Sequence, residues 1–275
     1  MARTPLRSAL SLCALLAAPA AAGAGSTLEA RYAVTFTGVT LGQGALVVEV
    51  NEEGYSAAGS AMVAGLLQMI TGGKGTAAAR GQIVNGRILP LSYSGNSESK
   101  ERSQEVRLAG AAGTIKDVYV EPKRPPTGDR VPLKDEHRKD VVDPMSAAIM
   151  PVAGNGDVTG ADACKRTLPI FDGEYRYDLV FSFERNDSAR EFKEMRGYGG
   201  PLAVCRVEYR PIAGHRLRRQ VQELSENKDI FVWLAPIEGT RIVMPVRVSF
   251  GSKIGAFVVQ ATHFMSEVKP RAATR

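Results

Sequence analysis

The sequence predicts an all-β protein: a single large antiparallel sheet coiled into a barrel or β-spiral, with two short helices. Two observations lead to this prediction. Apolar and polar residues alternate in many short segments, as they do in strands with one buried face. Turn-forming residues separate these segments, and the chain of 275 residues holds 28 Gly and 15 Pro. With 44% hydrophobic and 23% charged residues, the composition is globular and excludes a disordered class.

The first expected strand shows the alternation most clearly, because its apolar residues share one side: Leu28, Ala30, Tyr32, Val34 and Phe36. A turn region is expected over residues 38–44. Further strands are expected over residues 45–50, 55–61, 75–84, 87–94, 104–108, 114–120, 166–171, 174–183, 202–210, 216–224, 230–234, 241–250 and 256–263.

Two dipeptides, Asn85-Gly86 and Asp172-Gly173, each separate a pair of expected strands. Such dipeptides favour the primed turns whose twist matches that of antiparallel strands, so both predict tight hairpins. Residues 121–133 carry four prolines and are expected to form an extended, exposed loop. Because this loop is short and is the only linker-like stretch, one domain over residues 25–268 is favoured over two.

Two segments depart from the alternation and are expected to be short helices. In residues 62–71 the apolar side chains recur at helical spacing: Met62, Val63, Leu66, Leu67 and Ile70. This helix is interpreted either as a plug packed against the sheet or as a lid or membrane-touching element. The second helix begins at Asp143 and Pro144, which suit its N-cap and first turn, and Pro151 ends it after about two turns.

The N-terminal residues 1–24 have the features of a cleaved secretory signal peptide. Arg3 and Arg7 precede an apolar stretch, and small residues follow as cleavage sites. We therefore expect a periplasmic protein. No other apolar run reaches about 18 residues, so no membrane span is expected in the mature chain. Residues 269–275 are expected to form a flexible basic tail.

The net charge of the mature chain is modest. Loss of Arg3 and Arg7 lowers the basic count from 35 to 33 against 29 acidic residues, which leaves +4. This excess allows weak attraction to anionic lipid headgroups or polymers. Together with export, it argues against a nucleic-acid partner.

The mature chain keeps two cysteines, Cys164 and Cys205, because Cys13 leaves with the signal peptide. An even pair in an exported protein favours a disulfide. Closing a loop of 41 positions stabilises the fold by roughly 4 kcal/mol in the chain-entropy account. The alternative is a redox-active or metal-binding pair, although catalytic pairs usually stand close together as C-x-x-C.

No catalytic or metal-binding constellation stands out. Ser97–Lys100 has the S-x-x-K spacing of acyl-transferring enzymes but lies in a polar loop without the partner motifs. Gly72–Thr76 is similar to a phosphate loop, but Gly75 stands where Ser or Thr would hold magnesium. The three histidines are not spaced as metal ligands: His137, His215 and His263. No enzymatic activity, metal or cofactor is therefore expected.

A resemblance to a known family rests on four stretches: VDPMSAA at 142–148, FDGEYRYDL at 171–179, CRVEYRPIAG at 205–214 and MPVRV at 244–248. They resemble the domain of unknown function 3108 family of exported proteobacterial proteins. The family has no agreed activity, so the resemblance implies no active site. The architecture is also similar to that of the periplasmic envelope-integrity protein B family, which implies a β-spiral.

These features predict a non-catalytic periplasmic protein that supports cell-envelope integrity. It would bind a lipid, a peptidoglycan fragment or an envelope protein, since a closed or half-closed sheet can hold an apolar ligand. A filled barrel without a cavity is the opposing expectation. Two other functions stay open: an envelope hydrolase with an unidentified carboxylate or His site, and a scaffold that docks a partner through the Pro-rich loop 121–133.

Overall fold

The computed structural model describes residues 25–65, 68, 71–125, 127–252 and 254–269. The expected signal peptide, most of the expected tail and the side chains of Leu66, Leu67 and Ile70 lie outside the described residues. Among the helices of the described ranges, none is long and apolar enough to cross a membrane.

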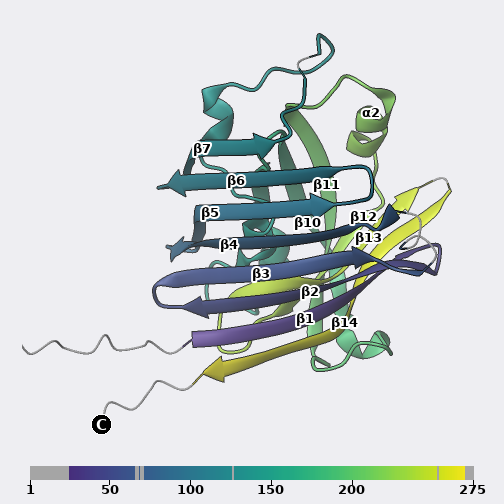
Figure 1. Cartoon of the computed structure of the whole chain (residues 1–275). Helices are drawn as coiled ribbons and strands as arrows, with labels where there is room; N and C mark the ends of the chain where they lie inside the picture. Colours follow the sequence, from purple (N-terminus) through teal and green to yellow (C-terminus); the bar gives the residue numbers. More distant parts are fainter. Residues whose placement is uncertain (1–24, 66–67, 69–70, 126, 253, 270–275) are drawn as a thin grey trace, which may run out of the picture.

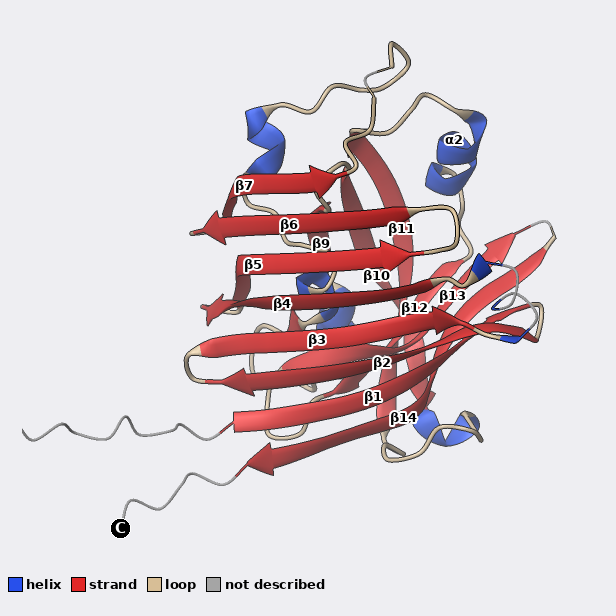
Figure 2. Ribbon diagram, viewed as in Figure 1, coloured by secondary structure: helices blue, strands red, loops and turns tan. Residues whose placement is uncertain are grey.

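The described chain forms one antiparallel sheet, which is curled but not closed (Figures 1 and 2). The strand order is β7-β6-β5-β4-β3-β2-β1-β14-β13-β12-β11-β10-β9, and β8 pairs with β13. The predicted fold class is thereby confirmed. The elements are β1 (Gly25–Phe36), β2 (Val39–Asn51), β3 (Gly54–Val63), β4 (Lys74–Val84), β5 (Arg87–Glu98), β6 (Ser103–Ala111), β7 (Thr114–Glu121), η1 (Asp135–Arg138), η2 (Ser146–Ala148), β8 (Met150–Pro151), η3 (Ala161–Cys164), β9 (Arg166–Phe171), β10 (Arg176–Ser188), η4 (Ala189–Glu191), β11 (Pro201–Ala213), α2 (Arg219–Ser225), β12 (Ile230–Pro236), β13 (Ile242–Ser252) and β14 (Gly255–Lys269).

The first and last strands are neighbours and join the two halves of the sheet. β1 and β14 pair from Gly25 opposite Lys269 to Phe36 opposite Phe257, with a bulge after Arg31. The two ends of the described chain therefore lie side by side (Figure 1).

The main hydrophobic core packs side chains of β1–β3 against those of β11–β14. Leu28, Val48, Leu202 and Met244 are among its fully buried members. A second core lies on the opposite face of β11, since alternate residues of that strand belong to the two clusters. It contains the disulfide between Cys164 and Cys205, whose Cα atoms lie 5.4 Å apart, so the predicted pairing is present.

The predicted Asn85-Gly86 hairpin is confirmed, with both residues at positive φ between β4 and β5. The prediction of a two-residue turn at Asp172-Gly173 is wrong. β9 and β10 are joined by four residues, because the Asp172 Oδ1 atom accepts hydrogen bonds from the backbone N–H groups of Glu174 and Tyr175. Gly173 has φ +102°, and a Cβ there would lie 2.9 Å from Val106 Cγ1, so the turn packs closely against β6.

Four boundary predictions are corrected by the structure. The expected turn region 38–44 contains only a tight turn, and β2 already begins at Val39. The expected helix at 62–71 begins later, because Met62 and Val63 still pair with β2 as part of β3. Gly65, Gln68 and Thr71 are helical. The expected two-turn helix after Asp143 is a single 3-10 turn over Ser146–Ala148.

The fourth correction concerns residues 216–224, which were expected to form a strand. They contain most of helix α2, where Arg219 and Glu223 form an i,i+4 ion pair of 2.9 Å. Such ion pairs stabilise short exposed helices. The alternation of arginine and leucine at the start of this segment does not exclude a helix.

Asp143 caps the turn that begins at Ser146 and is fully buried there. Its Oδ1 atom accepts from the backbone N–H groups of Met145 and Ser146, and Ser146 Oγ donates to its Oδ2 atom at 2.5 Å. Tyr55 Oη in turn donates to Ser146 Oγ at 2.7 Å, which ties this turn to β3. Burial raises the pKa of Asp143, although these hydrogen bonds oppose the shift.

We predict that Asp143→Asn gains stability relative to the wild type as the pH rises. The pKa of Asp143 in the folded protein is raised above its ordinary value of about 3.9. Below that ordinary value Asp143 is protonated in both the folded and the unfolded chain, and the protein has its full stability. This stability falls as the pH rises through the raised value. The side-chain oxygen of asparagine still accepts from the backbone N–H groups of Met145 and Ser146, and asparagine carries no charge. Urea unfolding of both proteins from about pH 4 upward checks this, and parallel pH profiles would contradict it.

We also predict that Cys164→Ser/Cys205→Ser lowers the free energy of unfolding by roughly 2–4 kcal/mol and clearly lowers the Tm. The disulfide sits in the second core and restrains the unfolded chain. Thermal unfolding with and without reductant measures the effect, and the double variant serves as the control that reductant leaves unchanged. Identical melting curves of the wild type with and without reductant would contradict the prediction.

Candidate functional site

An open cleft runs along the inner face of the first half of the sheet. Two cavities of about 920 and 510 Å³ make it up. The two cavities adjoin, because they share five lining residues: Ala61, Gly75, Ser97, Gln104 and Arg124. Ligand sites in proteins span about 300–1,000 Å³, so either cavity is large enough for a small molecule.

The floor of the cleft consists of small residues from three adjacent strands. Cross-strand pairing places them in two rows: Ala61, Gly75 and Ser97 in one, and Gly59, Ala77 and Gly95 in the next. Because these residues carry at most one heavy side-chain atom beyond Cβ, the inner face of the sheet is not filled here.

The side chains that face inward become smaller along β3 toward the cleft. Tyr55 and Ala57 are buried in the main core, and Gly59 and Ala61 follow on the same face. On β2 the inward residues run from Val50 and Val48 through Leu46 to residues 44 and 42, which are both glycine. One end of these strands therefore builds the core, and the other end leaves the cleft open.

The inner end of the cleft is polar. Arg124, from the Pro-rich loop, forms an ion pair of 2.8 Å between its Nε atom and Glu174 Oε2. The same carboxylate accepts a hydrogen bond of 2.9 Å from Gln104 Nε2. The Arg124 guanidinium also lies 5.0 Å from the centre of the Tyr175 ring and donates to Tyr175 Oη. These contacts attach the loop to the turn between β9 and β10.

Asp172 and Tyr93 complete this end. Burial raises the pKa of Asp172, against the two backbone hydrogen bonds to its carboxylate and the charge of Arg124. Burial also raises the pKa of Tyr93 to about 12, and the nearby charges of Asp143 and Asp172 add to that shift. Tyr93 is therefore a neutral hydroxyl at physiological pH.

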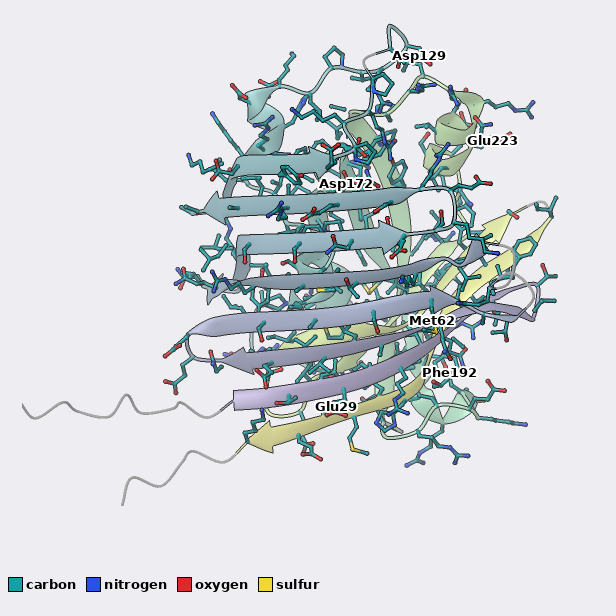
Figure 3. The ribbon with its side chains drawn as sticks, viewed as in Figure 1. Glu29, Met62, Asp129, Asp172, Phe192 and Glu223 are labelled. Atoms are coloured by element: carbon teal, nitrogen blue, oxygen red, sulfur yellow. A yellow bond between two sulfur atoms is a disulfide. The ribbon has the colours of Figure 1, made fainter. Side chains whose placement is uncertain are left out.

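The mouth of the cleft carries charged and apolar groups. Lys74 Nζ and Glu98 Oε2 form an ion pair of 3.1 Å across β4 and β5. Met62 lies near the end of β3 (Figure 3), is 46% exposed and accepts a hydrogen bond from Gln43 Nε2. Arg102 and Lys123 are exposed lining residues, and among the described ion pairs neither takes part.

The cleft gathers some of the residues singled out from the sequence and leaves others apart. Met62 and Val63 line its mouth, and Pro144 and Asp172 line its inner end. Asp143 caps a buried turn and Gly173 packs against β6, while Cys164 and Cys205 lie in the second core.

Three polar lining residues were not predicted: Gln104, Arg124 and Glu174. They come from β6, the Pro-rich loop and the turn after β9, so no spacing in the sequence connects them. The one relevant feature in the sequence is the set of prolines in residues 121–133, which predicts an extended loop there.

Within the described ranges, no three His, Cys, Asp or Glu residues lie close enough together to hold a metal ion. The histidines occupy separate places. His137 Nδ1 accepts from the backbone N–H of Lys134, His215 is buried beside the Pro-rich loop, and His263 lies on β14. The discarded S-x-x-K segment spans the end of β5 and the following turn, where Ser99 Oγ accepts from the backbone N–H of Arg102.

Fold and cleft together define a curled, open β-sheet protein with a ligand-sized cleft on its inner face. The chain belongs to the family described as protein of unknown function (DUF3108), whose profile matches residues 31–262. The family resemblance drawn from the four sequence stretches is thereby confirmed.

Among solved structures, the chain is similar to the β-barrel-like protein of domain of unknown function DUF1849 from Brucella abortus. The two share 10% sequence identity and a TM-score of 0.48, over 91% of this chain and 100% of that chain. No curated protein matches this chain.

We predict that Arg124→Ala loosens the Pro-rich loop without unfolding the protein. It removes a partly buried ion pair and a contact with an aromatic ring, worth together about 1–2 kcal/mol, so amide exchange in residues 121–133 should accelerate about tenfold. Hydrogen–deuterium exchange measures this. Lys123→Ala, which removes the neighbouring cation, is the matched control. Equal exchange in both variants would show that Arg124 does not hold the loop.

Proposed function

We propose that this protein is a non-catalytic periplasmic binding protein that supports the cell envelope by holding a lipid, or another molecule with an apolar chain, in the cleft. The observation that carries the proposal is the floor of glycine and alanine, which keeps a ligand-sized space open beside a well-packed core.

The lining suits an amphipathic ligand. Leu46, Ala77, Val106 and Met145 offer apolar surface in the deeper cavity. Binding sites for small molecules combine such surface with a few polar groups that fix orientation. Here those groups are Gln104, Tyr93 and the Arg124–Glu174 pair.

The contacts of the acidic residues support a binding role rather than hydrolysis. The Asp172 carboxylate already accepts two backbone hydrogen bonds, and the Glu174 carboxylate is shared between Gln104 and Arg124. A general acid or base must reach the reacting group. Both carboxylates are instead used to shape the turn and to attach the loop.

The periplasmic location is supported by the N-terminal sequence and by the disulfide. A charged start, an apolar stretch and small residues precede the described chain. Disulfides persist in oxidising compartments, and the pair Cys164–Cys205 is fully buried in the second core.

We predict that Ala77→Leu weakens binding of a fluorescent fatty acid, 11-(dansylamino)undecanoic acid, by about tenfold or more. The larger side chain would project into the deeper cavity and remove space for the chain of the probe. Ala78→Leu is the matched control, because the next residue of β4 faces the outside of the sheet. Titration of dansyl fluorescence measures both. Equal affinities, or an absence of binding by the wild type, would overturn the proposal.

Native mass spectrometry of protein purified from a periplasm identifies the natural ligand. An added mass that extracts into organic solvent and is lost in Ala77→Leu is the expected result. An added mass that stays in Ala77→Leu would place the ligand outside the cleft.

A further inference from the structure

We propose that the turns beside the cleft mouth dock onto a membrane surface containing anionic phospholipid. The tips are defined as the described ends of the hairpins β1–β2 and β13–β14, namely residues 36–39, 252 and 254–257. This proposal rests on the proposed function. It places the cleft mouth against the membrane surface, where an apolar ligand would be taken up or released.

The tips expose large apolar side chains at one end of the molecule. Val39 is 65% exposed, Ile254 81% and Phe257 38%. The two turns lie side by side, since the Thr37 backbone N–H donates to Ala256 O at 2.9 Å and Phe36 pairs with Phe257. In Figure 2 the hairpins of β1–β2 and β13–β14 project from the same side of the sheet.

The tips are continuous with the cleft. Val34 on β1 and Leu41 on β2 line the mouth, only a few residues from the exposed tip residues of the same hairpin. Met62, 46% exposed, also lies at this mouth, and the Leu41 carbonyl accepts from the backbone N–H of Ala64. A surface that covers the tips would therefore also face the cleft opening.

The charge at the mouth favours an anionic surface. Three cationic side chains line it against two acidic ones: Lys74, Arg102 and Lys123 against Glu98 and Glu101. Anionic lipid headgroups attract such clusters, while exposed apolar side chains gain by leaving water at the boundary of the acyl chains. The combination of separate apolar projections and flanking cations fits a lipid surface better than the flat, well-packed contact made between proteins.

Some polar groups of the described turn residues are already paired within the protein. Besides the Thr37–Ala256 hydrogen bond, Ser252 Oγ donates to Gly255 O at 2.7 Å. Internal hydrogen bonds of this kind lower the penalty for moving backbone groups out of water.

Co-sedimentation with vesicles tests the proposal. The wild type is expected to bind vesicles of equal parts phosphatidylglycerol and phosphatidylcholine, and to bind pure phosphatidylcholine or high-salt samples more weakly. Val39→Ser/Ile254→Ser should lower binding to the anionic vesicles by about tenfold or more. Val47→Ser/Leu217→Ser is the control, because it removes apolar side chains that are 42% and 75% exposed elsewhere.

A second measurement does not depend on removing apolar side chains from the tips. In Ile254→Trp, the emission of the new tryptophan should shift to shorter wavelength on anionic vesicles and be quenched by brominated lipid. Leu217→Trp should show neither effect. The single native tryptophan, Trp233, is buried in the core and gives a constant background.

Failure of this proposal is separable from failure of the binding function. Ala77→Leu should lose the fatty-acid probe but still bind vesicles, and Val39→Ser/Ile254→Ser should keep the probe. The docking proposal is overturned if the wild type does not bind anionic vesicles, or if both double variants bind equally. It is also overturned if light scattering shows that the tips instead hold two copies of the chain together.

Discussion

The pairing of β1 with β14 is the contact on which the rest of the structure depends. Without it the chain would form two smaller sheets, each with an exposed apolar face. The pairing aligns Leu28 and Ala30 with Phe264 and the rest of the main core, to which both halves contribute. A slip of one residue would turn these side chains outward, so burial fixes the register. Because the contact joins the two ends of the described chain, it requires the closure of a very long loop.

The cleft follows from where the core ends. The second half of the sheet has apolar clusters on both faces, whereas the first half shares the main core only at one end of its strands. Beyond Tyr55 the inward residues of β3 shrink to alanine and glycine, and beyond Leu46 those of β2 are glycine. Packing with native density would require larger side chains there. The loop that contains Arg124 lines this space and is held by Glu174 and Tyr175.

The sequence was most informative where a structure repeats locally. Alternation found nearly every strand, Asn85-Gly86 found a hairpin, and cysteine counting found the disulfide. It was least informative where a tertiary contact decides the outcome. Residues 216–224 alternate like a strand, but Arg216 makes an isolated bridge with Arg130 and residues 219–225 form helix α2. In the Asp172 turn Gly173 packs on β6, and the polar end of the cleft joins three segments distant in sequence.

Charge along the cleft gives the proposed ligand a direction. At the inner end two carboxylates, Asp172 and Glu174, face the single guanidinium of Arg124. At the mouth the balance is reversed, because Arg102 and Lys123 stand against Glu101 beside the ion pair of Lys74 and Glu98. A molecule with an anionic head and an apolar tail is therefore repelled by the inner end and attracted at the mouth. Under the proposed function it would enter tail first, with its chain over the glycine and alanine floor and its head beside the tips. A lipid in the leaflet that faces the docked protein has its head toward the protein and its chain pointing away, so tail-first entry requires the ligand to turn over as it leaves the membrane.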